Sequence, residues 1–277
     1  MRVPVLTYHA VNIAGNDYAT NDHVALASDL RTINRLGLRV VPLQWVVEQR
    51  LGLTTRDLSA CVALSCDDGS DFDFRDLEFR EHGLQRSFFN ILGDFVSEHG
   101  AAEQPHLNMT SFVIASPEAR AHIDRGALDG RGWMSEDWWP EAETSGLMTI
   151  GNHSWDHNHP AIPAPGVDGM PRGSFLDVDN EKRADAEIAD AARYINARIA
   201  PRRSRLFCYP FSHIPAFVHD DYLPRRGADI GLLAAFGDGA VPVTMASDIW
   251  NLPRYICGWH WRDPQALCGI LDASAQA

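Results

Sequence analysis

Short apolar runs alternate with segments of helical periodicity along most of this 277-residue chain. The runs that we predict as strands cover residues 3–8, 38–41, 61–66, 87–92, 147–151 and 206–210. The segments that we predict as helices from their apolar spacing cover residues 29–36, 43–51, 76–82 and 179–199. Strands that alternate with helices favour a mostly parallel sheet, because parallel neighbours need a crossover connection between them.

Two further helices are predicted from the residues at their ends. Ser135 is a favourable N-cap for a helix that runs through Trp138 and Trp139 and ends near Gly146. The pair Asp-Pro at 263–264 opens the last helix. Residues 93–132 and 160–173 break the alternation, and we expect loop insertions there. Neither a repeat nor a linker divides the chain, so we expect a single catalytic domain over residues 1–277.

The charge balance argues against some classes of partner. The chain carries 24 basic and 37 acidic residues, for a net charge of −13, which disfavours nonspecific binding to nucleic acid or to anionic membrane. No stretch approaches the roughly 20 apolar residues of an integral membrane segment. The five cysteines form no CxxC pair and the amino terminus has no signal-peptide pattern, so we expect reduced thiols and a cytoplasmic protein.

Two motifs carry most of the chemistry. Asp67 and Asp68, followed by a glycine, come directly after the apolar run 61–66, and His153 and His157 come directly after the run 147–151. One carboxylate and two imidazoles form a facial ligand set for a divalent metal with open positions for water and substrate. The second carboxylate can take a proton from water. The combination predicts a metal-assisted hydrolase, and groups that follow strands suit the rim of a (β/α) barrel.

Each motif has a simpler explanation when it is taken alone. Asp-Asp-Gly is most often a turn after a strand, and His-x-x-x-His frequently arises by chance. The joint occurrence of both motifs at predicted strand ends is what favours the metal site. A retaining glycosidase would also fit a barrel with paired acids, but it needs carboxyl groups about 5 Å apart across a sugar and no histidine pair.

The same motifs give the chain a resemblance to the polysaccharide deacetylase family, the NodB-homology carbohydrate esterases. Ser-Cys-Asp-Asp-Gly at 65–69 resembles the family's Thr-Phe-Asp-Asp-Gly, and His-Ser-Trp-Asp-His at 153–157 resembles its His-Ser/Thr-x-x-His. Weaker matches are Ser-Phe-Phe at 87–89, Cys-Tyr-Pro-Phe-Ser at 208–212, Thr-Tyr-His at 7–9 and Leu-Pro-Arg at 252–254. The last two are similar to a branch that includes deacetylases of poly-N-acetylglucosamine. The resemblance implies a distorted (β/α) barrel of the NodB-homology type, with long loop insertions at the rim.

The resemblance also implies a role for each residue of the two main motifs. Asp68, His153 and His157 would hold the metal, which is expected to be Zn²⁺, with Co²⁺ or Ni²⁺ as alternatives. Asp67 would act as the general base. Arg254 would be its partner and hold it in the charged form.

Two more groups complete the reaction that the resemblance implies. His9, on the first strand, would donate a proton to the leaving amine, and His260 is the alternative acid because many family members carry a late Leu-x-His. The backbone N–H of Phe211 would stabilise the oxyanion.

The implied substrate is an N-acetylated sugar or glycan, from which acetate is removed. Tyr209, Trp155, Trp250 and Trp259 are candidates for a platform under a sugar ring, although Trp and Tyr are also ordinary core residues. The same site would also suit an O-acetyl ester or a non-sugar amide, and an inactive carbohydrate-binding homologue is a third reading. The sequence leaves the sugar, the metal and the oligomeric state open.

Overall fold

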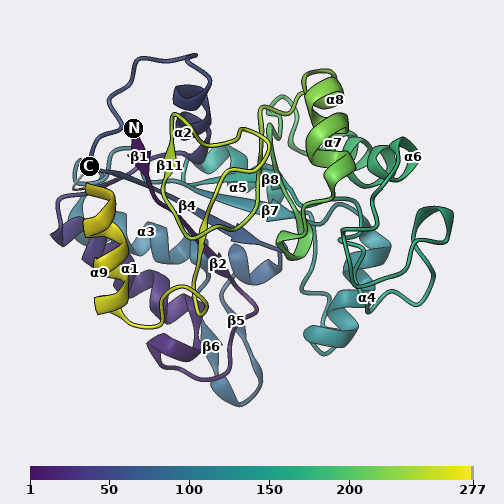
Figure 1. The fold of residues 1–277 in the computed structure, drawn as a ribbon. Helices are drawn as coiled ribbons and strands as arrows, with labels where there is room; N and C mark the ends of the chain where they lie inside the picture. The colour runs from purple at the N-terminus through teal and green to yellow at the C-terminus, as the bar shows by residue number, and fades with distance from the viewer. Residues whose placement is uncertain (276–277) are drawn as a thin grey trace.

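The centre of the molecule is one curved sheet of parallel strands, seen in a computed structural model that describes residues 1–275 (Figure 1). Seven strands run across it in the order β10, β9, β8, β7, β4, β2 and β12, and β3 pairs with the start of β4. Their bounds are Val5–His9 (β2), Arg39–Val40 (β3), Cys61–Asp67 (β4), Met109–Val113 (β7), Met148–Asn152 (β8), Leu206–Cys208 (β9), Ala234–Phe236 (β10) and Tyr255–Ile256 (β12). The predicted parallel sheet and barrel-like fold are confirmed.

The two edges of this sheet approach each other through the segment that precedes β12. The N–H of Leu252 donates to the carbonyl of Ala235 in β10 over 2.8 Å, and Gly237 donates back to Leu252 over 3.1 Å. The same chain then continues into β12, which pairs with β2. The sheet therefore curls into a distorted barrel, and residues around 254 reach strands that lie far away in sequence.

Two small antiparallel ribbons lie outside the main sheet. Strand β1 (Arg2–Val3) pairs with β11 (Val243–Thr244), and β5 (Leu77–Glu78) pairs with β6 (Leu84–Gln85).

Helices cover the outside of the sheet in two groups (Figure 1). α1 contacts both α3 and α9, whereas α6 and α8 pack in the apolar cluster with β9 and β10, and α7 contacts α5 and β8. The bounds of the helices are Asp22–Arg35 (α1), Leu43–Arg50 (α2), Phe88–His99 (α3), Pro117–Ala127 (α4), Trp139–Ser145 (α5), Glu181–Ala184 (α6), Asp190–Ile199 (α7), Leu223–Ile230 (α8) and Pro264–Ala275 (α9). None of the helices in the described part of the chain combines the length and the hydrophobicity that crossing a membrane requires.

Strand β4 shows why the sheet is buried on both faces. All seven of its residues are buried, and successive side chains point to opposite faces of the sheet. Val62 and Leu64 join the apolar cluster under α1 and α3, whereas Cys61 and Ala63 join a second cluster on the other face. A strand with apolar neighbours on both faces is typical of a parallel sheet covered by helices.

The predicted strand over residues 87–92 is wrong. Ser87 is the N-cap of α3, and its side chain accepts a hydrogen bond from the N–H of Asn90. The buried residues Phe88, Ile91, Leu92 and Phe95 have helical spacing, which the strand assignment overlooked.

The predicted loop over residues 93–132 is also wrong. This stretch contains the end of α3, the sheet strand β7 and helix α4. Strand β7 was hidden because it includes polar residues; Thr110 bonds to Thr149 over 3.1 Å and Ser111 donates to Asp73 over 2.6 Å. The second predicted loop, residues 160–173, is confirmed, since it forms only the short turn Val167–Gly169.

Of three other predicted helices, one is wrong, one begins later than predicted and one is confirmed. Residues 76–82 form strand β5 and a single turn, Arg80–His82, in place of a helix. Helix α5 ends at Ser145 with Gly146 as its C-cap, as expected, but it begins at Trp139, and Ser135 instead donates to the Asp71 carboxylate over 2.8 Å. The long helix expected over residues 179–199 is confirmed from Glu181 onward, with one π-helical turn, Asp185–Ala189.

Candidate active site

The carboxyl ends of neighbouring strands bring the predicted site residues together. β2 ends at His9 and β4 ends at Asp67, and these two residues are partners in the pairing of the two strands. Asp68 follows β4 directly, and His153 follows β8 directly. Because all these strands are parallel, their last residues share one rim of the sheet.

Asp68, His153 and His157 form a candidate metal-binding set. One ligand atom from each side chain lies within 4.8 Å of the others, and the Nε2 atom of each histidine lies 3.7 Å from Oδ1 of Asp68. Ligands about 2.1 Å from a tetrahedral zinc ion would lie about 3.4 Å apart, so the spacing fits such an ion with little movement.

Contacts around the two histidines favour the same role. The Nδ1 atom of His153 lies 2.9 Å from the carbonyl oxygen of Cys208, which leaves Nε2 of His153 free to face Asp68. Burial, and then the neighbouring His153, lower the pKa of His157. A neutral imidazole is the form that binds a metal.

The backbone around this set is held in uncommon conformations. Asp68, Ser154, His157 and Phe211 all have positive φ angles, of 77°, 69°, 62° and 58°. Non-glycine residues rarely adopt this region, and such residues cluster where a site fixes side-chain directions at a cost in free energy.

Asp67 is charged and fully engaged by one arginine. The Nη1 and Nη2 atoms of Arg254 donate to Oδ1 and Oδ2 of Asp67 over 2.8 and 2.9 Å, and Nε of Arg254 donates to the carbonyl of Gly237. Burial by itself would raise the pKa of Asp67, but the charge and hydrogen bonds of Arg254 outweigh burial and hold that pKa well below its usual range. Asp67 therefore remains a carboxylate at neutral pH.

His9 lies beside Asp67 at the rim of the sheet. Its Nε2 atom lies 4.0 Å from Oδ2 of Asp67, and its backbone N–H donates to Asp22 over 2.7 Å. The rival acid His260 uses its Nδ1 atom to accept the N–H of Ile256 over 2.7 Å. The structure therefore places His9, but not His260, next to the candidate base.

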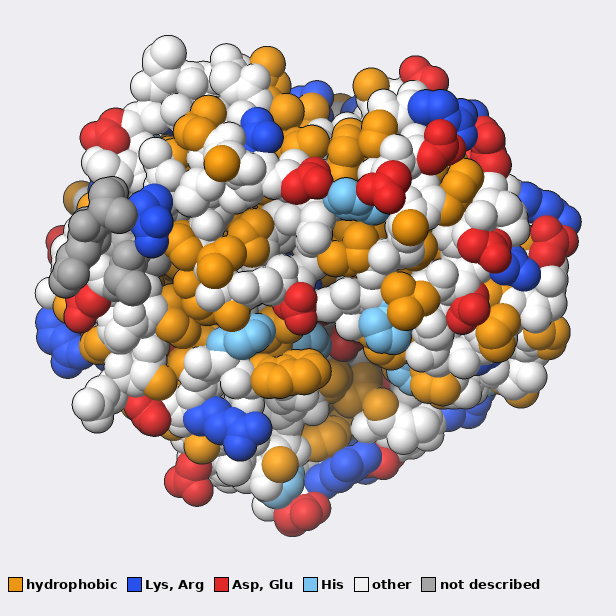
Figure 2. Space-filling view, viewed as in Figure 1, with side chains coloured by type: hydrophobic (Ala, Val, Ile, Leu, Met, Phe, Trp, Pro, Cys, Tyr) orange, Lys and Arg blue, Asp and Glu red, His pale blue; other side chains and the backbone are white. Residues whose placement is uncertain are grey.

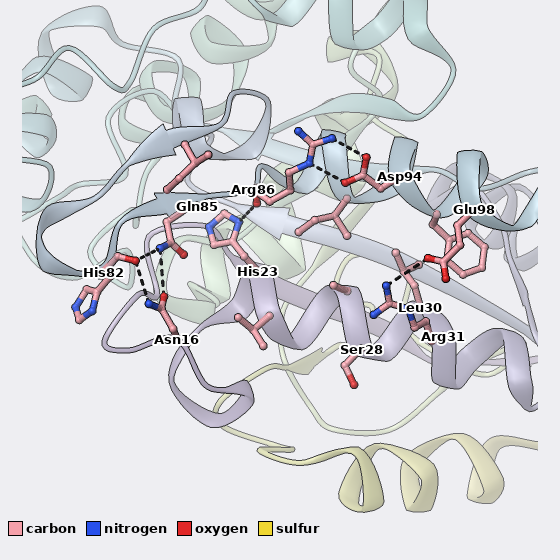
Figure 3. Close-up of a pocket in the computed structure, with 15 residues that line it drawn as sticks. Asn16, His23, Ser28, Leu30, Arg31, His82, Gln85, Arg86, Asp94 and Glu98 are labelled. Atoms are coloured by element: carbon pink, nitrogen blue, oxygen red, sulfur yellow. Dashed lines mark hydrogen bonds and ion pairs between the residues drawn. The ribbon is translucent and has the colours of Figure 1, made fainter.

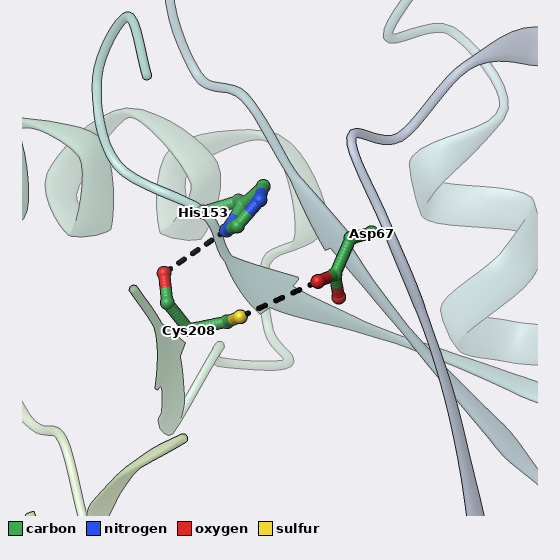
Figure 4. Close-up of side chains that lie close together, drawn as sticks. All are labelled: Asp67, His153 and Cys208. Carbon is green, nitrogen blue, oxygen red and sulfur yellow. Dashed lines mark hydrogen bonds between the residues drawn. The ribbon is translucent and has the colours of Figure 1, made fainter. Parts of the chain in front are cut away.

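Cys208 is a neighbour of the site that the sequence did not single out. Its Sγ atom lies 3.6 Å from Oδ2 of Asp67, and Asp67, His153 and Cys208 form a second close group (Figure 4). Burial raises the pKa of the Cys208 thiol, which keeps it protonated. Both oxygens of Asp67 already bind Arg254, so the set around Asp68 is the better metal site.

The space above these groups is a cavity of about 320 Å³. His9, Asp67, Asp68, His153 and His157 all line it, together with Phe211 and Trp259 near its mouth. In the space-filling view, histidines lie around a hollow whose surroundings include many hydrophobic side chains (Figure 2). This volume is within the range of small-ligand sites.

The candidate sugar platform is only partly at this cavity. Tyr209 is buried and donates to the carbonyl of Trp250 over 2.9 Å, while Trp250 packs in the cluster with Tyr209. Trp155 packs edge-on against Tyr194. Of the four aromatic candidates, Trp259 is the one that lines the cavity, and it is 77% exposed.

A second cavity, of about 520 Å³, lies between α1 and α3 (Figure 3). Its charged groups pair with each other: Arg86 binds Asp94, and Arg31 binds Glu98 over 3.3 Å. No group of three metal-ligating side chains among residues 1–275 lies in it. The rim of the sheet is therefore the candidate active site.

Comparison with known families agrees with this geometry. The family model for polysaccharide deacetylase matches residues 57–223, which is more than half of the chain and includes both the Asp67–Asp68 pair and the two histidines. The chain belongs to the polysaccharide deacetylase family. A comparison with curated proteins finds no match.

Solved structures share the whole fold of this polysaccharide deacetylase. IcaB from Ammonifex degensii is 19% identical, with a TM-score of 0.65, over 100% of this chain and 97% of its own. A de-N-acetylase from Aggregatibacter actinomycetemcomitans is 16% identical, with a TM-score of 0.62, over 98% of this chain and 100% of its own. Streptococcus pyogenes deacetylase PplD, solved with acetate, is 14% identical, with a TM-score of 0.63, over 98% of each chain. At these identities the likeness concerns the fold.

Sequence reasoning missed one side of the active site. Five apolar residues between the end of β7 and residue 134 line the cavity: Ile114, Ile123, Ala127, Leu128 and Met134. The first four come from residues 93–132, which we expected to be a loop, and Met134 follows that stretch. His159, which no spacing argument selected, also lines it. The apolar run around 112–115 was the available signal for β7, but it is short and follows two polar residues.

Proposed function

We propose that this polysaccharide deacetylase is a metal-dependent hydrolase that removes an N-acyl group, acetyl in the simplest case, from an N-acylated sugar. The observation that carries the proposal is the meeting of two sets of groups in one cavity. Asp68, His153 and His157 form the ligand set, and Asp67 and His9 flank it. A base, an acid and a ligand set are the parts that amide hydrolysis at neutral pH needs.

Three residues of the site would bind the metal ion that the reaction needs. Asp68 and the Nε2 atoms of His153 and His157 would hold a divalent ion, for which Zn²⁺ suits the donor set. When bound, the ion supplies a Lewis acid that polarises a carbonyl oxygen and makes water more acidic.

Asp67 accepts the proton of the attacking water, and Arg254 holds Asp67 in place. Each oxygen of Asp67 accepts one hydrogen bond from Arg254 and keeps lone pairs for a further donor. Asp67 takes the proton as the water oxygen bonds to the amide carbon. Arg254 keeps Asp67 charged and fixes its orientation, so the base is ready without rearrangement.

The leaving amine needs a proton before the carbon–nitrogen bond breaks. His9, on the opposite side of the site from the ligand histidines, donates that proton from its ring. The backbone N–H of Phe211 is our candidate donor to the developing oxyanion. The products are a carboxylate and a free amino sugar.

A metal-reconstitution assay tests the proposal. The protein is treated with chelator and then supplied with Zn²⁺, Co²⁺ or Ni²⁺, and the release of carboxylate and free amine from N-acylated sugars is followed. We expect turnover only with metal, and a rise in the melting temperature when the ion binds the folded state. A lack of turnover on every N-acyl sugar with all three ions would refute the proposal.

One variant separates the base from the ligand set. Asp67→Asn should retain the bound metal, measured by elemental analysis, and lose on the order of 10²–10⁴ in kcat. Asp229→Asn, at an exposed position away from the cavity, is the matched control and should keep full activity. Esters and amides that differ only in the bond broken, assayed in parallel, show which bond the enzyme prefers.

A further inference from the structure

The cavity above the metal ligands has few polar groups to spare for sugar hydroxyls. Beyond the five groups that we assign to the reaction, only His159 and Ser212 bring polar side chains to its lining. A buried sugar ring needs a hydrogen-bond partner for most of its hydroxyl groups, because unpaired polar groups are costly to bury. The cavity is therefore better suited to an apolar part of the substrate.

One continuous stretch of chain supplies five of the nine apolar residues that line the cavity, while Val11, Phe211, Ile256 and Trp259 supply the others. We call it the β7–α4 wall; its cavity-lining residues are Ile114, Ile123, Ala127, Leu128 and Met134. Four of these side chains are buried, and Ala127, the last residue of α4, is exposed at the edge of the wall.

The order of the strands in the sheet indicates which part of the substrate would contact the β7–α4 wall. β4, which carries Asp67, lies between β2 and β7. His9 ends β2, and it protonates the nitrogen that leaves. The sugar amine therefore lies on the β2 side, near the exposed ring of Trp259, and the acyl group lies on the β7 side.

The volume allows an acyl group well beyond acetyl. A cavity of about 320 Å³ has room for roughly ten groups of water or methylene size, at about 30 Å³ each. An acetyl methyl would leave most of the β7–α4 wall uncovered.

We propose that the substrate is an amino sugar with a medium-length N-acyl chain, of about four to eight carbons, which lies along the β7–α4 wall. This inference rests on the proposed function and names its substrate class. Water adds to the amide carbon, the carbon–nitrogen bond breaks, and the products are the fatty carboxylate and the protonated amine. Each methylene that the wall covers contributes to the binding of the transition state.

A series of N-acyl glucosamines tests this assignment. The N-acetyl, N-butanoyl, N-hexanoyl and N-octanoyl compounds are assayed with the metal-reconstituted enzyme. We expect kcat/KM to rise roughly fourfold per added methylene up to the length that the cavity holds, the factor that corresponds to about 0.8 kcal/mol per buried CH₂. Hexanoate should also inhibit more strongly than acetate, because it occupies the same wall.

A substitution at the wall provides the structural control. Ala127→Phe places a ring at the edge of the wall, and it should lower kcat/KM for the hexanoyl substrate at least tenfold more than it lowers kcat/KM for the acetyl substrate. Ala121→Phe makes the same change on the same helix at an exposed position outside the cavity, and it should change neither.

Two outcomes would overturn the inference and leave the proposed function in place. One is a preference for N-acetyl over every longer chain. The other is a rate that depends on an apolar group attached to the sugar but not on acyl length. Failure to hydrolyse any N-acyl sugar would instead count against the proposed function itself.

Discussion

At the scale of single residues, the charge of Asp67 depends on Arg254. Arg254→Lys keeps a positive charge but loses the paired donors that match a carboxylate. Burial raises the pKa of Asp67, and the charge and hydrogen bonds of Arg254 lower it. The pKa of Asp67 should therefore rise in this variant, because a lysine replaces only part of what Arg254 provides. Since the ionised form is the active one, the acidic limb of the kcat/KM profile should move to higher pH, and the free energy of unfolding should fall by about 1.5–3 kcal/mol.

The measurement is a pH–rate profile with a parallel urea titration. Arg193→Lys, at an exposed position on α7, is the control and should change neither quantity. An unchanged acidic limb in Arg254→Lys would mean that Arg254 does not set the ionisation of Asp67.

His9 has a role that depends on the leaving group. His9→Gln should lower kcat on an N-acyl sugar by on the order of 10²–10⁴, because an unprotonated amine leaves poorly. A p-nitrophenyl ester has a leaving group that needs no acid, so its hydrolysis should change much less. Equal losses on both substrates would indicate that His9 supports the structure and not the proton transfer.

The same comparison decides between the two candidate acids. His260→Gln removes a ring whose Nδ1 atom accepts the N–H of Ile256. We expect this variant to lower stability slightly and to affect amide and ester hydrolysis alike. A loss confined to the amide would transfer the acid role to His260.

At the scale of elements, the turn after β4 positions Asp68 because Gly69 packs closely against β7. Gly69 has a φ of +69°, and a Cβ added there would lie 2.6 Å from Cγ1 of Val113 in β7. Gly69→Ala should therefore destabilise the protein by several times the roughly 1 kcal/mol of an ordinary glycine effect, and it should weaken metal binding by displacing Asp68.

A second glycine provides the matched control for that change. Gly93 lies in α3, has no atom within 4 Å of an added Cβ, and has an ordinary helical conformation. Gly93→Ala should stabilise the protein by about 0.4–1 kcal/mol. Urea unfolding of both variants measures the difference, and equal effects would contradict the close approach at Gly69.

Elements were predictable from the sequence where one periodicity dominated. The runs that became β2, β4, β8 and β9 are apolar and short, and each leads to a site residue, so both the strands and the candidate ligands could be predicted. Helix α3 was missed although its buried residues have helical spacing, and strand β7 lacked a clear local pattern. Ser111 in β7 is polar because it binds Asp73, a contact between residues 38 apart, and no local pattern contains that information.

At the scale of the whole molecule, the fold class followed from the alternation of elements, but the closure of the sheet did not. Arg254 and Asp67 are 187 residues apart, and they meet because the segment before β12 bonds to β10 while β12 itself pairs with β2. The sequence suggested the pair only through resemblance to a family. The β7–α4 wall was missed for a related reason, since apolar residues on one face of α4 predict burial in general and not a particular cavity.

A buried carboxyl group links strand β2, helix α1 and the loop before α9, and it makes the free energy of unfolding depend on pH. Asp29 of α1 accepts hydrogen bonds from Tyr8 of β2, from Tyr18 and from Trp261. Burial raises the pKa of Asp29 to about 6 in the folded protein. Between about pH 4 and pH 6 the folded state therefore holds a proton that the unfolded state has lost, so this group's contribution to stability declines as the pH rises through that window, by up to about 3 kcal/mol.

Replacing this carboxyl group should remove that part of the pH dependence. Asp29→Asn cannot ionise, so its free energy of unfolding should fall less than that of the parent protein between pH 4.5 and pH 7.5, whatever the absolute stability of the variant. Urea titrations across this range, with chelator present so that metal binding does not contribute, measure the two slopes. Asp229→Asn removes an exposed carboxyl group and should keep the parent slope. If Asp29→Asn also keeps the parent slope, Asp29 is ionised in the folded protein and the three donors around it stabilise a charge.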